Sequence, residues 1–198
     1  LTATSNFNGA SLIATPGSIT QSGGILTGNT VLTSVNGSIT LDKNNNLRDF
    51  GGTSHGGGDV TFNNVGSSTL SLSLNTTGNA VVTAAGDVLG SYINVNDLSL
   101  TAGSIDLRTN VDVNSFSKLV ASYGDILVTN TGSFSIAGDV TTNRPGLRTT
   151  DLRANGGGIS QTAGTISGHY VSLRSTGDLV QSGPARVDSN AAYFSGAN

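Results

Sequence analysis

Five aspartates that directly follow a glycine are the residues of this chain best suited to acid–base chemistry. They are Asp59, Asp87, Asp125, Asp139 and Asp178. Two carboxylates about 5 to 10 Å apart are the usual machinery of a glycosidase, so a polysaccharide-degrading enzyme is one alternative. Serine follows other glycines in the same pattern, and both residue types have a short side chain that hydrogen-bonds the backbone of a turn. We therefore interpret the five aspartates as turn residues and predict no catalytic residue.

Other reactive groups are scarce. The chain has no cysteine and only two histidines, His55 and His169, which argues against a metal site built on thiolates or imidazoles. The segment His55-Gly-Gly-Gly58 resembles the oxyanion loop of lipases, but we interpret it as a glycine-rich corner. A Gly-Lys-Ser/Thr phosphate loop does not occur in the sequence. We predict neither a metal site nor a cofactor, and we expect a protein that is not an enzyme.

Charge and hydropathy exclude two classes of partner. The net charge of −3 argues against nucleic-acid binding, which depends on basic residues. No apolar run reaches the roughly 18 residues that a membrane-spanning helix requires, so we expect no membrane insertion of this segment.

A short motif repeats along the chain, and its spacing indicates the fold that positions the candidate residues. The sequence Gly-Ser-Ile-Thr begins at Gly17 and again at Gly37. The general pattern is Gly, then Ser or Asp, then an aliphatic residue. The spacing between neighbouring copies is often about 20 residues, which is typical of a solenoid coil. The predicted structural corners are Gly17, Gly37, Gly58, Gly103, Gly124 and Gly177.

Composition and alternation give the fold class. Charged residues make up 11 % of the chain, against roughly 25 % in a typical domain, while Thr, Ser, Val and Asn, which suit strands and turns, are abundant. Alternation places Ile39 and Leu41 on one face of a strand and Thr40 on the other. We predict an all-β, single-stranded parallel β-helix (β-solenoid) of about ten coils of roughly 20 residues, close to 50 Å long. The residues leave the hand of the winding open.

Two further features concern domain organisation. We expect residues 1–198 to form a single β-solenoid domain with a protruding loop near 142–150, where Arg144-Pro-Gly146 is a strong turn signal. Gln161 and Gln181 are separated by one repeat and should stack as an amide ladder. Both ends of the chain consist of repeat material without a charged cap. We therefore expect either a piece of a longer rod or a subunit that self-associates through its coil ends into a filament.

Basic residues gather in the C-terminal part. Residues 141–198 hold five Arg and three Asp, whereas residues 1–140 hold four Lys or Arg and nine Asp. Arg153 and Arg174 precede equivalent corners and should stack. Arginine binds carboxylate and sulfate groups through paired hydrogen bonds, so a basic stripe would bind acidic glycans. Its predicted members are Arg144, Arg148, Arg153, Arg174 and Arg186.

The repeat units resemble a known family. The residues that carry the resemblance are the Gly-Ser/Asp-aliphatic unit, Ile159-Ser-Gln-Thr-Ala-Gly-Thr-Ile-Ser-Gly168, and Asn46-Leu-Arg-Asp-Phe-Gly-Gly52 followed by Asp59-Val-Thr-Phe62. These units are similar to the repeats of filamentous-haemagglutinin-like exoproteins, the two-partner-secretion adhesins of Gram-negative bacteria. The resemblance implies a right-handed β-helical rod, an extracellular or cell-surface location, and host or cell-surface glycans or proteins as partners. On this basis we expect a structural and adhesive rod. A self-assembling filament subunit and a polysaccharide-binding or polysaccharide-degrading β-helix are the alternatives.

Overall fold

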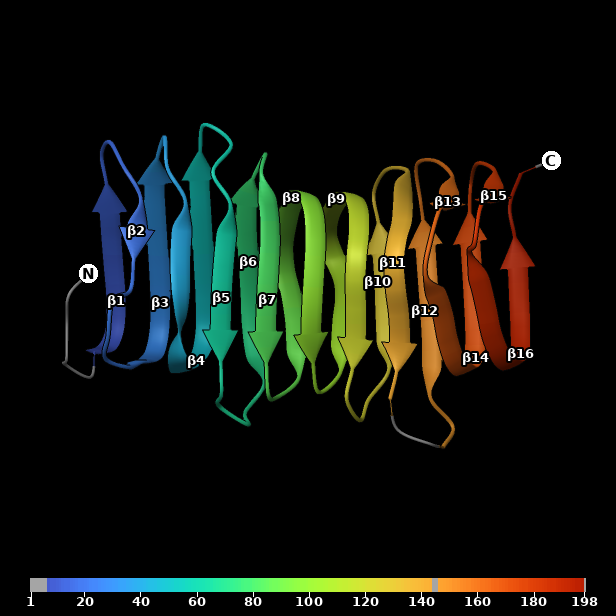
Figure 1. Ribbon diagram of the computed structural model, residues 1–198, viewed down its shortest axis with the longest axis horizontal. Coiled ribbons are helices and arrows are strands. Elements are labelled where there is room, and N and C mark those ends of the chain that lie inside the picture. The colour runs from blue at the N-terminus through green and yellow to red at the C-terminus, as the bar shows by residue number, and fades with distance from the viewer. Residues whose placement is uncertain (1–6, 144–145, 198) are drawn as a thin grey trace.

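The computed structural model describes residues 7–143 and 146–197, and these residues form a β-solenoid. Strands follow one another along the long axis, from the N-terminal end at the left of Figure 1 to the C-terminal end at the right. Neighbouring strands pair in parallel and make about nine turns. The described residues include no helix, and hence none that could cross a membrane. The predicted parallel β-helix is confirmed, with about nine coils where ten were expected.

Sixteen strands build the described coils. In chain order they are β1 (Phe7–Ala14), β2 (Ile19–Thr20), β3 (Leu26–Val35), β4 (Ile39–His55), β5 (Val60–Asn64), β6 (Leu70–Thr76), β7 (Asn79–Ala84), β8 (Val88–Ala102), β9 (Ile105–Ala121), β10 (Ile126–Asn130), β11 (Phe134–Thr142), β12 (Thr149–Ala154), β13 (Ile159–Gln161), β14 (Thr165–Ser175), β15 (Leu179–Gln181) and β16 (Arg186–Ser195).

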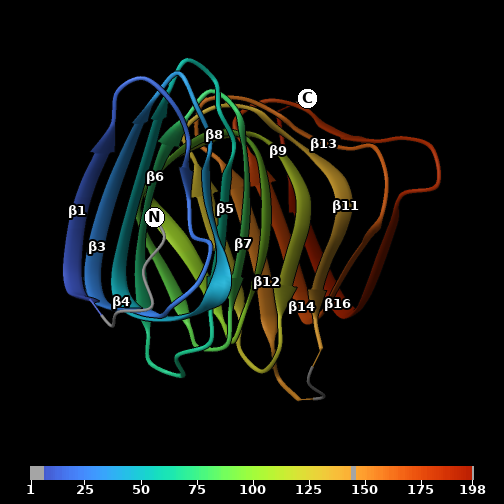
Figure 2. The same cartoon turned by 60° about the vertical axis from the view of Figure 1, so that its left-hand side comes forward.

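The pairing sorts the strands into two rows that wrap around one core (Figure 2). The first row contains β1, β3, β6, β10 and β12, and the second row contains β2, β5, β7, β11, β13 and β15. Long strands belong to both rows because they bend around a corner. For example, β8 pairs with β6 through Val88–Asn94 and with β7 through Asp97–Thr101. The registers of β8 shift near these bends, where a bulge increases the curvature of a strand.

The glycine motif marks two different corners of the coil. Gly17, Gly37 and Gly58 come just before second-row strands, whereas Gly103 and Gly124 come just before the first-row strands β9 and β10. Gly78 precedes the second-row strand β7 and Gly103 precedes β9, so the spacing of more than 20 residues between these two glycines reflects a change of corner. A chain that turns into a strand needs the same small residue and hydrogen-bonding side chain at either corner.

Alternating side chains fill the interior. Ile39 and Leu41 are fully buried and Thr40 lies on the other face, as the alternation predicts. Phe50 and Phe62, from successive coils, stack with their ring centroids 4.3 Å apart. Burying one large aliphatic or aromatic side chain contributes about 1.5 to 3 kcal/mol, so the stacked coils share a core that no single coil could form.

The predicted loop falls on the connection between β11 and β12. β11 ends at Thr142 and β12 begins at Thr149, close to the predicted loop at 142–150. In the described part of this connection Leu147 is 70 % exposed. Arg144 lies outside the described residues.

Candidate functional site

Three of the predicted corner glycines stack on one another along the rod. A Cβ atom added to Gly37 would lie 2.5 Å from the carbonyl carbon of Gly17, and one added to Gly58 would overlap the carbonyl of Gly37. Gly17 has φ of +128°, a conformation that favours glycine. Close coil-to-coil approach, together with backbone conformation, therefore explains these glycines.

The other three predicted corners are also crowded, in two different ways. A Cβ atom at Gly103 would meet the side chain of Tyr123, and one at Gly124 would meet Ser104. At Gly177 it would lie 2.9 Å from the backbone of the preceding coil. Gly103 thus makes room for an aromatic side chain, which no other predicted corner does.

Residues that follow the corner glycines hold adjacent coils together. The backbone N–H of Ser38 donates to Ser18 Oγ at 3.0 Å, that of Asp59 donates to Ser38 Oγ at 3.1 Å, and that of Asn79 donates to Asp59 Oδ1 at 2.8 Å. The sequence predicted bonds to the residue's own turn. The structure corrects this, because each bond crosses to the next coil, whose N–H lies directly above the side chain.

Two further aspartates of the Gly-Asp pattern act in the same way. Asp125 Oδ1 accepts from the backbone N–H of Thr149 at 2.9 Å, and Asp139 Oδ1 accepts from that of Thr165 at 2.9 Å. These carboxylate oxygens are committed to the backbone of the neighbouring coil, which is a structural use of the candidate acidic residues.

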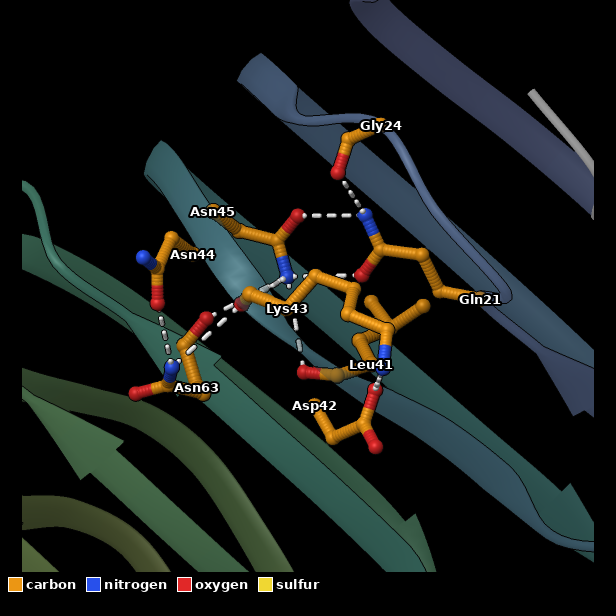
Figure 3. A network of polar contacts seen from close by, with 8 residues as sticks. All are labelled: Gln21, Gly24, Leu41, Asp42, Lys43, Asn44, Asn45 and Asn63. Carbon is orange, nitrogen blue, oxygen red and sulfur yellow. Dashed lines mark hydrogen bonds and ion pairs between the residues drawn. The ribbon is translucent and has the colours of Figure 1, made fainter. Parts of the chain in front are cut away.

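Buried amides form a second type of link between coils (Figure 3). Gln21 and Asn45 exchange two hydrogen bonds, with Gln21 Nε2 donating to Asn45 Oδ1 at 2.9 Å and Asn45 Nδ2 donating to Gln21 Oε1 at 3.0 Å. The backbone N–H of Leu26 also donates to Asn45 Oδ1, and Asn45 Nδ2 reaches the Lys43 carbonyl at 3.1 Å. Hydrogen bonding satisfies these buried polar groups, so the network is structural.

The predicted glutamine ladder is confirmed near the C-terminal end. Gln161 pairs in register with Gln181, and Gln181 Nε2 donates to Gln161 Oε1 at 3.2 Å. Repeat spacing was sufficient for this prediction because both residues occupy the same position in adjacent second-row strands.

A serine inside β4 matches a motif of catalytic nucleophiles, although no such motif was predicted from the sequence. Gly52-Thr-Ser-His-Gly56 fits the Gly-x-Ser-x-Gly pattern of the nucleophile elbow. That elbow requires a sharp strand-to-helix turn that exposes the serine, whereas Ser54 lies in a strand and is 3 % exposed. Its hydroxyl donates to the carbonyl of Gly37 at 2.6 Å. Ser54 is therefore part of the coil-to-coil bonding.

Among the described members of the predicted basic stripe, one pair stacks. Arg153 pairs in register with Arg174, as predicted. Arg148 precedes the start of β12, at the far end of that strand from Arg153, and Arg186 begins β16, opposite Thr165. The described arginines therefore do not form one continuous stripe, because they come from different corners of the coil.

Aspartates sit among these arginines. Arg153 Nη2 lies 2.8 Å from Asp151 Oδ2, and Arg174 Nε lies 3.8 Å from Asp151 Oδ1. Arg186 pairs with Asp188 at 2.9 Å. Neighbouring carboxylates reduce the local positive potential, so the role of this face in binding acidic glycans stays a prediction.

A lateral groove lies where β8, β9 and β10 begin. We call it the Tyr123 groove; its volume is about 410 Å³. It is lined by Thr69, Asp87, Leu89, Ser104, Ile105, Asp106, Tyr123, Gly124, Asp125, Leu127 and Arg148. Carboxylates, an aromatic ring, leucines and one arginine therefore meet in a single hollow on the side of the rod.

The hydrogen bonds and ion pairs of the charged residues determine the electrostatics of this groove. Asp106 accepts a hydrogen bond from Arg108 Nε at 2.7 Å and pairs with its Nη2. Asp87 Oδ1 is buried, and the side chain of Asp87 hydrogen-bonds the phenol of Tyr123. Burial, followed by the nearby carboxylate of Asp87, raises the pKa of Tyr123 above its ordinary value.

A second lateral hollow of about 670 Å³ lies over the first coils. Its lining includes Gly9, Asn29, Asn46 and Ser67, with Arg48 as the charged residue. The lining is polar and carries one positive charge, which suits an anionic group rather than an apolar one. Neither hollow holds a group of three or more His, Asp or Glu side chains arranged for a metal ion, among the residues that the structure describes.

Comparison with known proteins identifies no relative of this chain. No protein-family model, no curated protein and no solved structure matches the chain.

Proposed function

We propose that this chain is a structural and adhesive β-solenoid, a segment of a bacterial cell-surface or secreted fibre, and that it is not an enzyme. One observation carries the proposal. Three of the five candidate aspartates, Asp59, Asp125 and Asp139, accept hydrogen bonds from the backbone of an adjacent coil, and Ser54 donates to one. Reactive side chains that hold neighbouring coils together favour a structural role over a catalytic one.

The adhesive part of the proposal concerns the sides of the rod. A solenoid presents its outward side chains in regular columns over its whole length, which gives extended binding surfaces. The resemblance to haemagglutinin-like repeats supports an extracellular or cell-surface location and glycans or proteins of other cells as partners.

A bead assay tests adhesion. Beads coated with the folded chain should be retained on cultured epithelial cells, whereas beads coated with the same chain after urea unfolding should not be. Equal retention of both preparations would contradict an adhesive role of the fold.

A second assay tests the absence of catalysis. The chain is incubated with uronate polymers and with neutral polysaccharides, and new reducing ends and the ultraviolet absorbance of unsaturated products are followed. We expect no signal above buffer. Turnover that disappears in Asp106→Asn would show that the chain is an enzyme acting in the Tyr123 groove.

Self-association is a second candidate function, and the last described coil favours it. Its inner face is a cavity of about 280 Å³ lined by apolar side chains that include Leu173, Leu179, Val187 and Phe194, and Phe194 is 52 % exposed. We infer that the first coil of a second copy covers this face. Ile19-Thr-Gln-Ser-Gly23 is similar to Leu179-Val-Gln-Ser-Gly183, so the covering coil would present a strand sequence like that of the coil it covers.

Analytical ultracentrifugation over a range of concentrations tests this candidate. The chain should form concentration-dependent oligomers that Phe194→Asp abolishes and Val81→Asp, an outward-facing change in β7, does not. A monomer at all concentrations, or equal effects of both variants, would contradict stacking.

A further inference from the structure

We propose that the Tyr123 groove binds a neutral glycan. This inference rests on the adhesive function proposed above, since it assigns a ligand class and a place to it. The groove combines an aromatic surface, apolar pads and hydrogen-bonding groups in one hollow of about 410 Å³, which is within the usual size range of ligand sites, about 300 to 1,000 Å³.

Three successive coils contribute equivalent positions to the groove. Asp87, Ser104 and Asp125 each follow a glycine of the same corner, and each precedes the first residue of β8, β9 or β10. Successive strands are about 4.8 Å apart, so the groove extends roughly 10 Å along the rod. A site of this length fits an extended sugar chain better than a single small ion.

Apolar side chains form part of the lining of the groove. Tyr123 lies over Gly103 and is 38 % exposed. Leu89 is 49 % exposed, and Leu89, Asp106 and Leu127 are aligned in register across three strands. A pyranose ring has an apolar C–H face, and tyrosine offers a rigid amphipathic surface on which such a face can pack.

Tyr123 is a departure from the repeat. The residue before the glycine is Asn36 at Gly37, Gly57 at Gly58 and Ala85 at Gly86. An aromatic ring at this position is not needed to build a corner, because the other corners are built without one. The ring also requires Gly103 beneath it, since any side chain there would overlap it.

Hydrogen-bonding groups line the same groove. The side chain of Asp87 lines the groove and hydrogen-bonds the phenol of Tyr123, so its carboxylate lies beside the ring and can accept from a ligand hydroxyl. Arg148 supplies donors in the same hollow. Sugar hydroxyls both donate and accept, so they match a carboxylate and a guanidinium together.

The balance of charge selects a neutral sugar over an acidic one. Three carboxylates line the groove, from Asp87, Asp106 and Asp125. Arg148 and the Arg108 that pairs with Asp106 leave one negative charge uncompensated. Sulfated or carboxylated glycans would be repelled here, in contrast to the face that carries Arg153 and Arg174.

Nuclear magnetic resonance of the whole chain tests the proposal with three neutral probes, maltohexaose, cellohexaose and chitohexaose. At least one should shift the backbone amide signals of Ser104, Gly124 and Leu127 with a Kd in the range of about 0.1 to 10 mM. Tyr123→Ala should weaken binding at least tenfold, and Asp87→Asn should weaken it as well. Tyr123→Phe, which keeps the ring, and Tyr92→Ala, an exposed tyrosine outside the groove, should bind as the unmodified chain does.

Several outcomes would overturn the inference. No groove shifts with any of the three probes at about 10 mM, or equal shifts in a Tyr123→Ala variant that has kept its circular dichroism spectrum, would refute a neutral-glycan site. Groove shifts caused by calcium chloride or heparin in place of the neutral probes would assign it to a cation or an acidic glycan. If no probe shifts the groove signals while beads coated with the folded chain still adhere to cells, only the neutral-glycan site is refuted. If the probes are cleaved, the proposal that the chain is not an enzyme is refuted as well.

Discussion

Removing the hydroxyl of Ser54 measures how much the links between coils stabilise the rod. Ser34, Ser54 and Thr76 stand in register in successive first-row strands. Each donates its hydroxyl at 2.6 Å to the carbonyl of a corner glycine in the preceding coil. In Ser54→Ala the carbonyl of Gly37 loses this donor.

The expected cost follows from the burial of the bond. Leaving a buried acceptor without its partner costs about 1 to 3 kcal/mol. For a domain of this size each kcal/mol lowers Tm by about 2 to 4 °C, so Ser54→Ala should melt about 2 to 12 °C lower. Ser54→Thr should retain most of the stability, because threonine already fills this position as Thr76 in the next coil.

Urea unfolding followed by far-ultraviolet circular dichroism is the appropriate assay. The midpoint should fall while the slope m stays constant, since the surface exposed on unfolding is unchanged. Ser73→Ala is the matched control, because Ser73 is a half-buried serine of β6 on the outward face. A loss in Ser54→Ala no larger than that in Ser73→Ala, which should stay within about 0.5 kcal/mol, would refute the reasoning.

Three further predictions follow from the same geometry. Gly37→Ala should prevent folding, because its Cβ would lie 2.5 Å from backbone in the adjacent coil. Gly23→Ala, with open space around the added Cβ, should fold normally. Soluble yield and circular dichroism distinguish the two variants, and equal behaviour would contradict the stacking of the coils. Asp151→Asn should increase retention on heparin, since it unmasks the two arginines that Asp151 neutralises; unchanged retention at low salt would show that this face binds no acidic glycan. The phenol of Tyr123 should titrate above its ordinary pKa, and Asp87→Asn should bring it down. Because the raised pKa belongs to the folded state, its contribution to stability is complete below the ordinary tyrosine pKa and is lost as the pH rises through the folded value; an ultraviolet titration in which all tyrosines ionise together would contradict it.

Much of the fold was predictable because the sequence repeats. The regular spacing of the glycine motif, with alternation inside each strand, specified a parallel solenoid and the inward positions of Ile39 and Leu41. The same spacing placed Gln161 beside Gln181 and Arg153 beside Arg174. These predictions succeeded since both members of each pair occupy the same position in adjacent coils.

Other features depended on how the coils vary in length. Hydrogen bonds between neighbouring coils join residues as few as 17 and as many as 26 positions apart, so spacing alone does not identify the neighbour of a given side chain. That is why the sequence did not separate the two glycine corners, did not show that Asp125 bonds the next coil, and did not place Asp151 between two arginines.

The sequence by itself determined the architecture, and the tertiary structure decided the sites. Repetition determines architecture because every coil must cover the apolar face of the one before it. A lateral groove arises where the repeat is broken, as it is by Tyr123 over Gly103. Its lining comes from residues of at least three coils, among them Asp87, Asp106 and Leu127, and only the register of the stacked coils brings those residues together.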